Sequence, residues 1–263
     1  MERRTRAWGT ALAVGVLLAV TGCGSDTSAG RGDGDAKGAN SPSPSASSPG
    51  SPSVGSPSAL NPSSDSGSGS DGKPAAAELL PGMVSAKVAR TQLAALTVAE
   101  PRSMAGYSRA RFPHWAEQGA KCDTRETVLK RDGKDVRNDA DCRAVSGTWV
   151  SLYDGQTITE AGKLDIDHMV PLAAAWRAGA DKWDDSRRKA FANDLTNPQL
   201  LAVSAKTNRS KGDQTPDQWQ PPSRDAWCVY GRAWTRVKSA YELTVTETER
   251  KTLTDMLDTC GAS

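Results

Sequence analysis

The sequence predicts an α+β fold, rich in helices and with a small sheet, preceded by a segment that has no fold of its own. The 263 residues are 37% hydrophobic, 24% charged and 5% aromatic, a composition that suits one medium-sized globular domain and is too polar for several membrane spans. Ser, Pro, Gly and Asp dominate residues 24–74. Beyond them, apolar residues recur at both helical and alternating spacing, which indicates helices together with a few strands.

Residues 1–23 have the pattern of a bacterial export signal. A basic start precedes an apolar run from Ala7 to Val20, which is too short to span a bilayer comfortably. Cys23 follows small residues as in a lipobox, and we expect it to be lipidated; the alternative is an ordinary secretory signal with an incidental cysteine. Acyl chains contribute about 0.8 kcal/mol per buried methylene. We therefore expect a protein outside the cytoplasm, anchored by lipid to the outer face of the membrane or secreted.

Residues 24–77 are predicted to be a disordered Ser/Pro/Gly tether. They contain almost no apolar side chains, so burial cannot offset the conformational entropy that folding would cost. Gly/Ser stretches are flexible and Pro stretches extended. Such a tether would hold a domain of residues 78–263 away from the membrane.

The elements of this domain follow from local patterns. Apolar spacing predicts helices within 78–100 (interrupted by Pro81), 172–194, 227–241 and 246–257. Short strands are predicted at 127–129, 148–153, 164–170 and 199–203. Ser204 is placed to cap a helix that carries residues 206–211. Thr246 and Glu249 have the spacing of a capping box at the start of the last helix.

Four cysteines lie in the predicted domain: Cys122, Cys142, Cys228 and Cys260. They form no Cys-x-x-Cys pair, which disfavours a zinc knuckle, and an even number in an exported chain indicates two disulfides with three possible connectivities. We favour Cys122–Cys142 and Cys228–Cys260, because each pair lies within its own segment.

Histidine content excludes one functional class, and the net charge limits where nucleic acid could bind. The chain has only two histidines, so a zinc site with three histidine ligands cannot form. The net charge is +2, which provides no general basic field for nucleic acid; a polyanion site would have to be local.

Two segments carry the residues that indicate chemistry. Asp167 and His168 end one predicted strand, and Asn208 and Lys211 lie on the helix after the next strand, with Asn197 between them. This order is the layout of a ββα-metal site. Hydrolysis of a phosphodiester needs a base, and histidine has an unperturbed pKa of about 6.5. It also needs a cation, and the hard oxygens of Asp167 and Asn208 suit Mg²⁺, or Mn²⁺, better than Zn²⁺.

Other charged residues near these segments have two interpretations. Arg209 and Lys211 could hold flanking phosphates. Arg125 could contact phosphate or instead pair with Asp123 or Glu126. Asp165 lies on the same strand face as Asp167, where it could support the metal or pair with an arginine; we favour support.

Several spaced motifs resemble one protein family. Leu-Asp-Ile-Asp-His-Met-Val-Pro-Leu, Asn-Pro-Gln-Leu-Leu-Ala-Val-Ser and Thr-Asn-Arg-Ser-Lys-Gly-Asp occur in order, after Tyr107-x-Arg-x-x-Phe-x-x-Trp. They resemble exported bacterial HNH endonuclease family proteins of the GmrSD C-terminal-like (DUF1524) branch of the His-Me finger nucleases, over roughly residues 107–260.

The resemblance implies a role for each motif residue. His168 would be the general base, Asp167 and Asn208 the metal ligands, and Asn197 the residue that braces the loop and the base, so that the triad reads His-Asn-Asn. The stretch between His168 and Asn208 is longer than in compact HNH modules and contains a helical insertion. No cysteine pairs bind zinc beside the motif, and we expect disulfides to stabilise the core instead.

The sequence thus predicts a metal-dependent endonuclease that cuts DNA, or RNA, outside the cell and acts as a monomer. One alternative is a surface-tethered module that binds nucleic acid or wall polymer on a catalytically decayed nuclease scaffold. Another is a hydrolase of a different phosphodiester in the cell wall.

Overall fold

A computed structural model describes residues 80–261. The predicted signal peptide with Cys23 and the predicted tether at 24–77 therefore lie outside the described residues. Within 80–261, none of the helices combines the length and the apolar character needed to cross a membrane.

The described residues form a mixed α and β fold. The α-helices are α1 (Ala86–Ala95), α2 (Thr124–Asp132), α3 (Leu172–Arg177), α4 (Asp185–Ala192), α5 (Ala205–Lys211), α6 (Trp227–Ala240) and α7 (Glu247–Leu257). The strands are β1 (Glu117–Gly119), β2 (Cys122–Asp123), β3 (Lys134–Asn138), β4 (Ala144–Val150), β5 (Thr157–Ile158), β6 (Leu164–His168) and β7 (Leu200–Ser204). They make three small antiparallel sheets, β1-β2, β3-β4-β5 and β6-β7. The predicted α+β class is confirmed.

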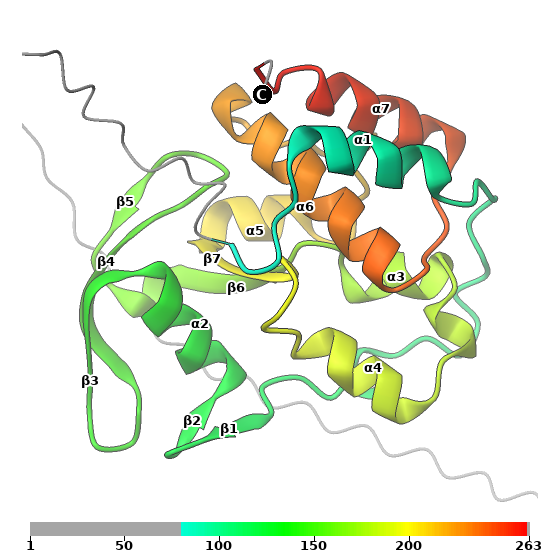
Figure 1. Cartoon of the computed structure of the whole chain (residues 1–263). Coiled ribbons are helices and arrows are strands. Elements are labelled where there is room, and N and C mark those ends of the chain that lie inside the picture. The colour runs from blue at the N-terminus through cyan, green and yellow to red at the C-terminus, as the bar shows by residue number, and fades with distance from the viewer. Residues whose placement is uncertain (1–79, 262–263) are drawn as a thin grey trace, which may run out of the picture. The chain divides into compact units, whose positions relative to one another are not determined.

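The β6-β7 sheet and α5 form the centre of the domain (Figure 1). The two strands are in register, with Leu164 opposite Ser204 and His168 opposite Leu200. Ser204 ends β7 and caps α5 by accepting a hydrogen bond from the Thr207 amide, as predicted. The long connection from β6 to β7 contains α3 and α4, which confirms the expected helical insertion.

The two faces of this sheet belong to different parts of the core. Leu164, Ile166, Leu200 and Ala202 pack with α2 and Trp149. Neighbouring positions on the opposite face, Leu201 and Val203, join the larger helical cluster. Side chains alternate between the faces of a strand, so Asp165 and Asp167 are directed away from the Leu164 face.

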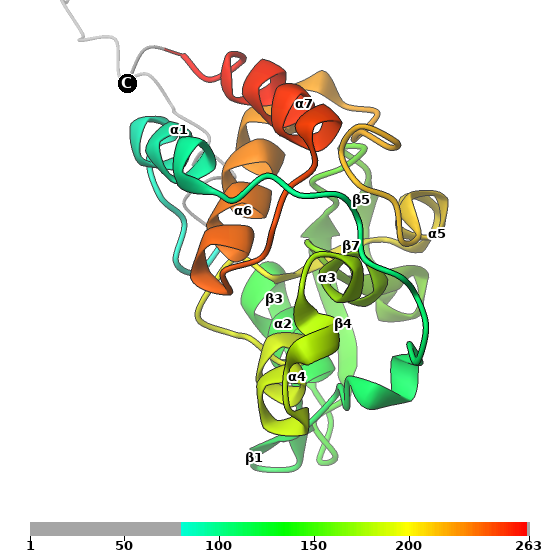
Figure 2. The same cartoon turned by 90° about the vertical axis from the view of Figure 1, so that its right-hand side faces the viewer.

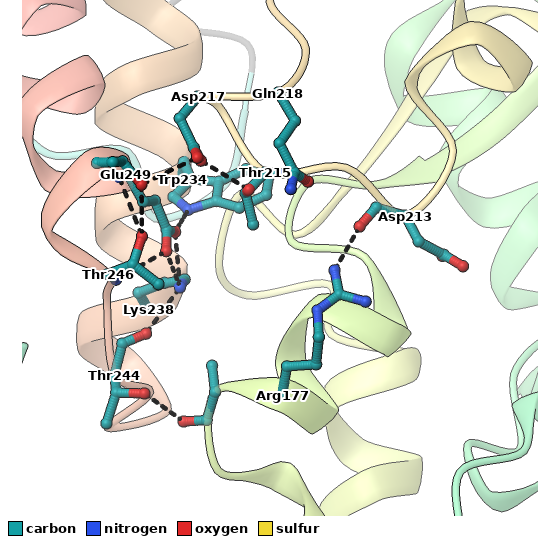
Figure 3. Close-up of polar contacts among 12 residues, drawn as sticks. Arg177, Asp213, Thr215, Asp217, Gln218, Trp234, Lys238, Thr244, Thr246 and Glu249 are labelled. Carbon is teal, nitrogen blue, oxygen red and sulfur yellow. Dashed lines mark hydrogen bonds and ion pairs between the residues drawn. The ribbon is translucent and has the colours of Figure 1, made fainter. Parts of the chain in front are cut away.

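Helices α1, α6 and α7 pack side by side at one end of the domain (Figures 1 and 2). The Lys238–Glu249 ion pair joins α6 to α7 with an N–O distance of 2.6 Å, and both side chains are buried. The Trp234 indole also donates to Glu249 (2.6 Å), and Lys238 donates to the Thr244 carbonyl (2.7 Å) (Figure 3). Thr246 and Glu249 form the predicted capping box at the start of α7.

Both predicted disulfides are confirmed. Cys122 at the start of β2 pairs with Cys142, between β3 and β4, with a Cα–Cα distance of 5.1 Å. Cys228 in the first turn of α6 pairs with Cys260 beyond the end of α7, at 4.9 Å. Each bridge closes a segment of the domain, as the positions in the sequence suggested.

The strand predicted at 127–129 is wrong, because these residues lie in α2. Asp123 accepts a hydrogen bond from the Glu126 amide and so begins the helix there. The helix is short, and it buries only Thr124, Val128 and Leu129. Three buried positions are too few to display helical periodicity, so the run of Thr, Val and Leu resembles a strand.

Candidate functional site

His168 is held at the end of β6 by one hydrogen bond. Its Nε2 lies 3.0 Å from the carbonyl oxygen of Ala192, at the end of α4. A carbonyl can only accept, so Nε2 carries the proton and a neutral His168 has its lone pair on Nδ1. The ring is buried and lies near the rings of Trp115 and His114, with centroids 6.0 Å and 6.3 Å away.

The surroundings of His168 favour its neutral form. Burial lowers the pKa of His168 to about 3, although the hydrogen bond to Ala192 opposes this shift. The positive charges of Arg109 and Lys211 add to the lowering. A neutral imidazole with a free Nδ1 has a lone pair to offer, although a pKa this far below 7 makes it a weaker base than an unperturbed histidine.

Asp167 is buried and forms an ion pair with Lys211. The Lys211 ammonium donates to both carboxylate oxygens (2.9 and 2.7 Å) and to the His168 carbonyl (2.8 Å). The Tyr153 hydroxyl donates to Asp167 Oδ2 at 2.5 Å. Burial raises the pKa of Asp167, and the Lys211 charge opposes that rise.

The position of Lys211 differs from the phosphate-binding role expected from sequence. Its side chain is fully buried, and its three N–H donors already have acceptors in Asp167 and His168. Lys211 lies one helical turn beyond Asn208, so α5 presents both side chains to β6. A buried lysine with all donors used positions Asp167 and the end of β6 and is not exposed to a phosphate.

Asn208 and Asp165 are paired across α5 and β6. The Asn208 amide donates through Nδ2 to Asp165 Oδ2 at 3.2 Å, and no described residue donates to its Oδ1. This hydrogen bond fixes the orientation of the amide and leaves its carbonyl oxygen available. Arg209, which is mostly exposed, lies 3.6 Å from the same Asp165 oxygen. Asp165 thus pairs with an arginine, one of the two alternatives left open by its sequence position, and also holds the Asn208 amide. The favoured alternative, support of a metal, stays a prediction.

These residues border one pocket of about 180 Å³. Asp167, His168, Asn208 and Arg209 line it, together with Arg109 from the segment before α2. The pocket therefore contains a candidate base, hard oxygen donors on Asp167, Asn208 and Asp213, and two cations.

Arg125 and Asn197 lie outside this pocket. Arg125 donates to Glu126 at 2.5 Å and to the Ala161 carbonyl at 3.2 Å, which favours the ion-pair interpretation over phosphate binding. Asn197 donates to Asp194 Oδ2 at 2.8 Å, inside the loop between α4 and β7. It therefore stabilises the loop that follows Ala192 but does not contact His168.

Gln199, which sequence reasoning missed, braces the chain directly after His168. Its side chain is fully buried, accepts from the Val170 amide (3.1 Å) and donates to the Val170 carbonyl (3.0 Å). Its backbone carbonyl accepts from the Met169 amide at 2.7 Å. The only available signal was its place in the Asn-Pro-Gln motif.

We expect Gln199→Ala to lower the free energy of unfolding by about 1–3 kcal/mol, because two buried backbone groups of Val170 lose their partners. Urea denaturation of the full chain measures this. The matched control is Gln156→Ala at an exposed side chain, for which a change within about 0.5 kcal/mol is expected. Equal effects of the two substitutions would contradict the proposed role of Gln199 in holding the backbone of Val170.

A second missed element is the segment before α2, which packs on His168. Asn193 follows Ala192 directly and binds this segment by accepting from the Ala116 amide (2.8 Å) and donating to the Pro113 carbonyl (2.7 Å). Between these two contacts, Trp115 has a positive φ of 61°. Side chains rarely adopt this conformation without support from their surroundings.

The fold and the pocket define a class of domain: a two-stranded sheet followed by a helix, with a histidine and hard oxygen donors at their junction. The family of GmrSD restriction endonuclease C-terminal domains matches residues 123–256. An uncharacterized secreted protein of Arthroderma benhamiae is 51% identical over 187 residues, which cover 71% of this chain and 92% of that protein. No solved structure matches the chain. This chain belongs to the GmrSD C-terminal domain family and is a nuclease-related domain.

Proposed function

We propose that the protein is a metal-dependent endonuclease of the HNH type that hydrolyses phosphodiester bonds of DNA, with RNA as a further possible substrate. The observation that carries this proposal is the pocket shared by His168, Asp167 and Asn208. Strand β6 supplies Asp167 and His168 and helix α5 supplies Asn208, with β7 between them in the chain, the order expected of a His-Me finger core. The family's relation to restriction endonucleases supports the choice of nucleic acid as substrate.

The donors in the pocket fit a hard divalent cation. Asp167 offers carboxylate oxygens, and Asn208 an amide oxygen to which no described residue donates. Residues 80–261 contain no group of three or more His, Cys, Asp or Glu side chains arranged to hold a metal. One carboxylate and one amide suit Mg²⁺ or Mn²⁺, because Mg²⁺ commonly keeps several waters and binds few protein ligands. When bound, the ion would neutralise charge on the phosphate.

The side chains of this chain account for the proton transfer. His168 holds its Nε2 proton against Ala192, so Nδ1 takes a proton from the attacking water. The water oxygen bonds to phosphorus, and the bond to the leaving sugar oxygen breaks. The leaving oxygen then takes a proton from solvent. Arg209, whose side chain is 76% exposed, is available to contact a flanking phosphate.

The protein is proposed to work outside the cytoplasm, attached by lipid at Cys23 and carried on the tether. Two disulfides support an oxidising compartment. The Arthroderma benhamiae relative is described as secreted. Labelling with a radioactive fatty acid, compared with a Cys23→Ser variant, tests the anchor.

The test of the function uses the full chain, purified with its disulfides formed and incubated with supercoiled plasmid. We expect nicking in Mg²⁺ or Mn²⁺ and none in EDTA. Asn208→Ala is expected to raise the Mg²⁺ concentration needed for half-maximal rate, because it removes one of few protein ligands. Cleavage that persists in EDTA would overturn the metal-dependent mechanism.

A binding module without catalysis is favoured by one observation. The Asp167 carboxylate already accepts hydrogen bonds from Lys211 and Tyr153, so a metal would have to share it. This alternative predicts that the folded chain binds labelled DNA or wall polymer but cuts neither in any metal. The same assay with both polymers separates it from the nuclease and from a wall-polymer hydrolase.

A further inference from the structure

We propose that Arg109 is a substrate-binding residue that contacts a phosphate of the nucleic acid beside the bond that is cut. The proposal rests on the nuclease function above. Arg109 lies outside the residues that match the family, 123–256, and the sequence motif that contains it is not used by the mechanism.

The first argument is the place of Arg109 in the pocket. Its side chain lines the same pocket as Asp167, His168 and Asn208. It is exposed, and within residues 80–261 its side chain forms no hydrogen bond or ion pair. Asp213 also lines the pocket, but no ion pair joins it to Arg109. An arginine with all its donors available can form two parallel hydrogen bonds to a phosphate.

The second argument is that the segment carrying Arg109 is anchored on both sides. Arg109 begins a short 3-10 turn, Arg109–Arg111. Before it, Tyr107 packs edge-on against Trp176 with centroids 5.8 Å apart. After it, the fully buried Phe112 packs against Trp176 and Phe191, both at 6.3 Å. A phosphate ligand held on a rigid element loses less entropy on binding than one on a free loop.

The third argument is that this segment is tied to the backbone that holds His168. Asn193 binds the segment at Pro113 and Ala116, and its neighbour Ala192 accepts the hydrogen bond from His168. The positive φ of Trp115 lies between these contacts. A backbone in this conformation persists only where its surroundings hold it, which fits the two contacts that anchor the segment. The connection links the segment that carries Arg109 to the backbone that orients the base.

Lys211 cannot take this role, because it is buried against Asp167. Arg111, two residues along, is also unsuitable, since it donates to the Gly106 carbonyl (3.3 Å) and stacks on the Trp176 ring at 4.9 Å. Of the two arginines in the turn, only Arg109 lines the pocket and has a side chain without a hydrogen bond or ion pair to the described residues.

The test compares Arg109→Ala and Arg109→Lys with Arg137→Ala in the full chain. Arg137 is an exposed arginine on β3 that does not line the pocket. The first readout is binding of a fluorescein-labelled DNA duplex by anisotropy in EDTA, across a salt series. The second is plasmid nicking in Mg²⁺, and thermal unfolding verifies the fold of each variant.

We expect Arg109→Ala to weaken DNA binding by about tenfold and to reduce the slope of log K against log salt by about 0.9, the value for one lost phosphate contact. Arg109→Lys should restore the slope and part of the affinity, and Arg137→Ala should match the wild type. An Arg109→Ala variant that binds and cuts like an active wild type would overturn the Arg109 proposal alone. If the wild type binds DNA without cutting it, the proposed nuclease function is overturned. The binding measurements on the Arg109 variants then still test whether Arg109 contacts a phosphate. A wild type that does neither would overturn both.

Discussion

His168→Ala is expected to slow plasmid cleavage by about 10²–10⁴-fold, which is the usual contribution of a positioned general base. The reason is the hydrogen bond from Nε2 to Ala192, which leaves the Nδ1 lone pair as the proton acceptor of a residue that lines the pocket. The measurement is the initial rate of nicking in Mg²⁺ at a temperature where circular dichroism shows both proteins folded.

Two controls separate loss of the base from loss of structure. His114→Ala removes the other histidine, which does not line the pocket, and we expect its rate loss to be at least tenfold smaller. Added imidazole should restore part of the His168→Ala activity, because the vacated space adjoins a pocket of about 180 Å³. A His168→Ala protein as fast as the wild type would remove His168 from the mechanism.

Lys238→Met is expected to destabilise the domain by about 3–5 kcal/mol, because it removes one partner of a buried ion pair. The substitution leaves Glu249 charged and buried between α6 and α7, with the Trp234 indole and the Thr246 amide as its remaining donors (Figure 3). Burial lowers the pKa of Lys238, and the charge of Glu249 opposes this shift. Urea denaturation followed by tryptophan fluorescence measures the loss.

The double variant Lys238→Met, Glu249→Gln tests whether the unpaired charge is the cause. Glutamine keeps an acceptor for Trp234 and removes the buried charge, so the double variant should be more stable than Lys238→Met alone. The exposed pair of Lys251 and Asp255 on α7, at 2.9 Å, is the matched comparison. We expect Lys251→Met to cost less than about 1 kcal/mol.

Local patterns in the sequence predicted several features correctly. The two disulfides, the cap at Ser204, the capping box at Thr246 and the order of β6, β7 and α5 are all present. Each depends on residues close in the chain or on a simple count, so no knowledge of packing was needed. The same patterns predicted that Asp167, His168 and Asn208 belong to one site, and all three line one pocket in the structure.

Features that depend on burial required the tertiary structure. Lys211 and Arg209 lie two residues apart in the same basic segment, and nothing local distinguishes them. Packing of α5 against β6 buries Lys211 against Asp167 and leaves Arg209 exposed. A buried lysine requires a paired charge, whereas an exposed arginine does not, so the two side chains have different roles.

The partner of the base was also decided by the tertiary structure. The sequence determined that a histidine follows an aspartate at the end of a strand, with an asparagine on a later helix. It could not show that the Ala192 carbonyl accepts a hydrogen bond from Nε2, that Gln199 braces Val170, or that Arg109 lines the pocket. The first two contacts join residues that are 24 and 29 positions apart, and they use backbone carbonyls whose chemistry is the same at every residue. Only the folded chain determines which of them lies beside His168.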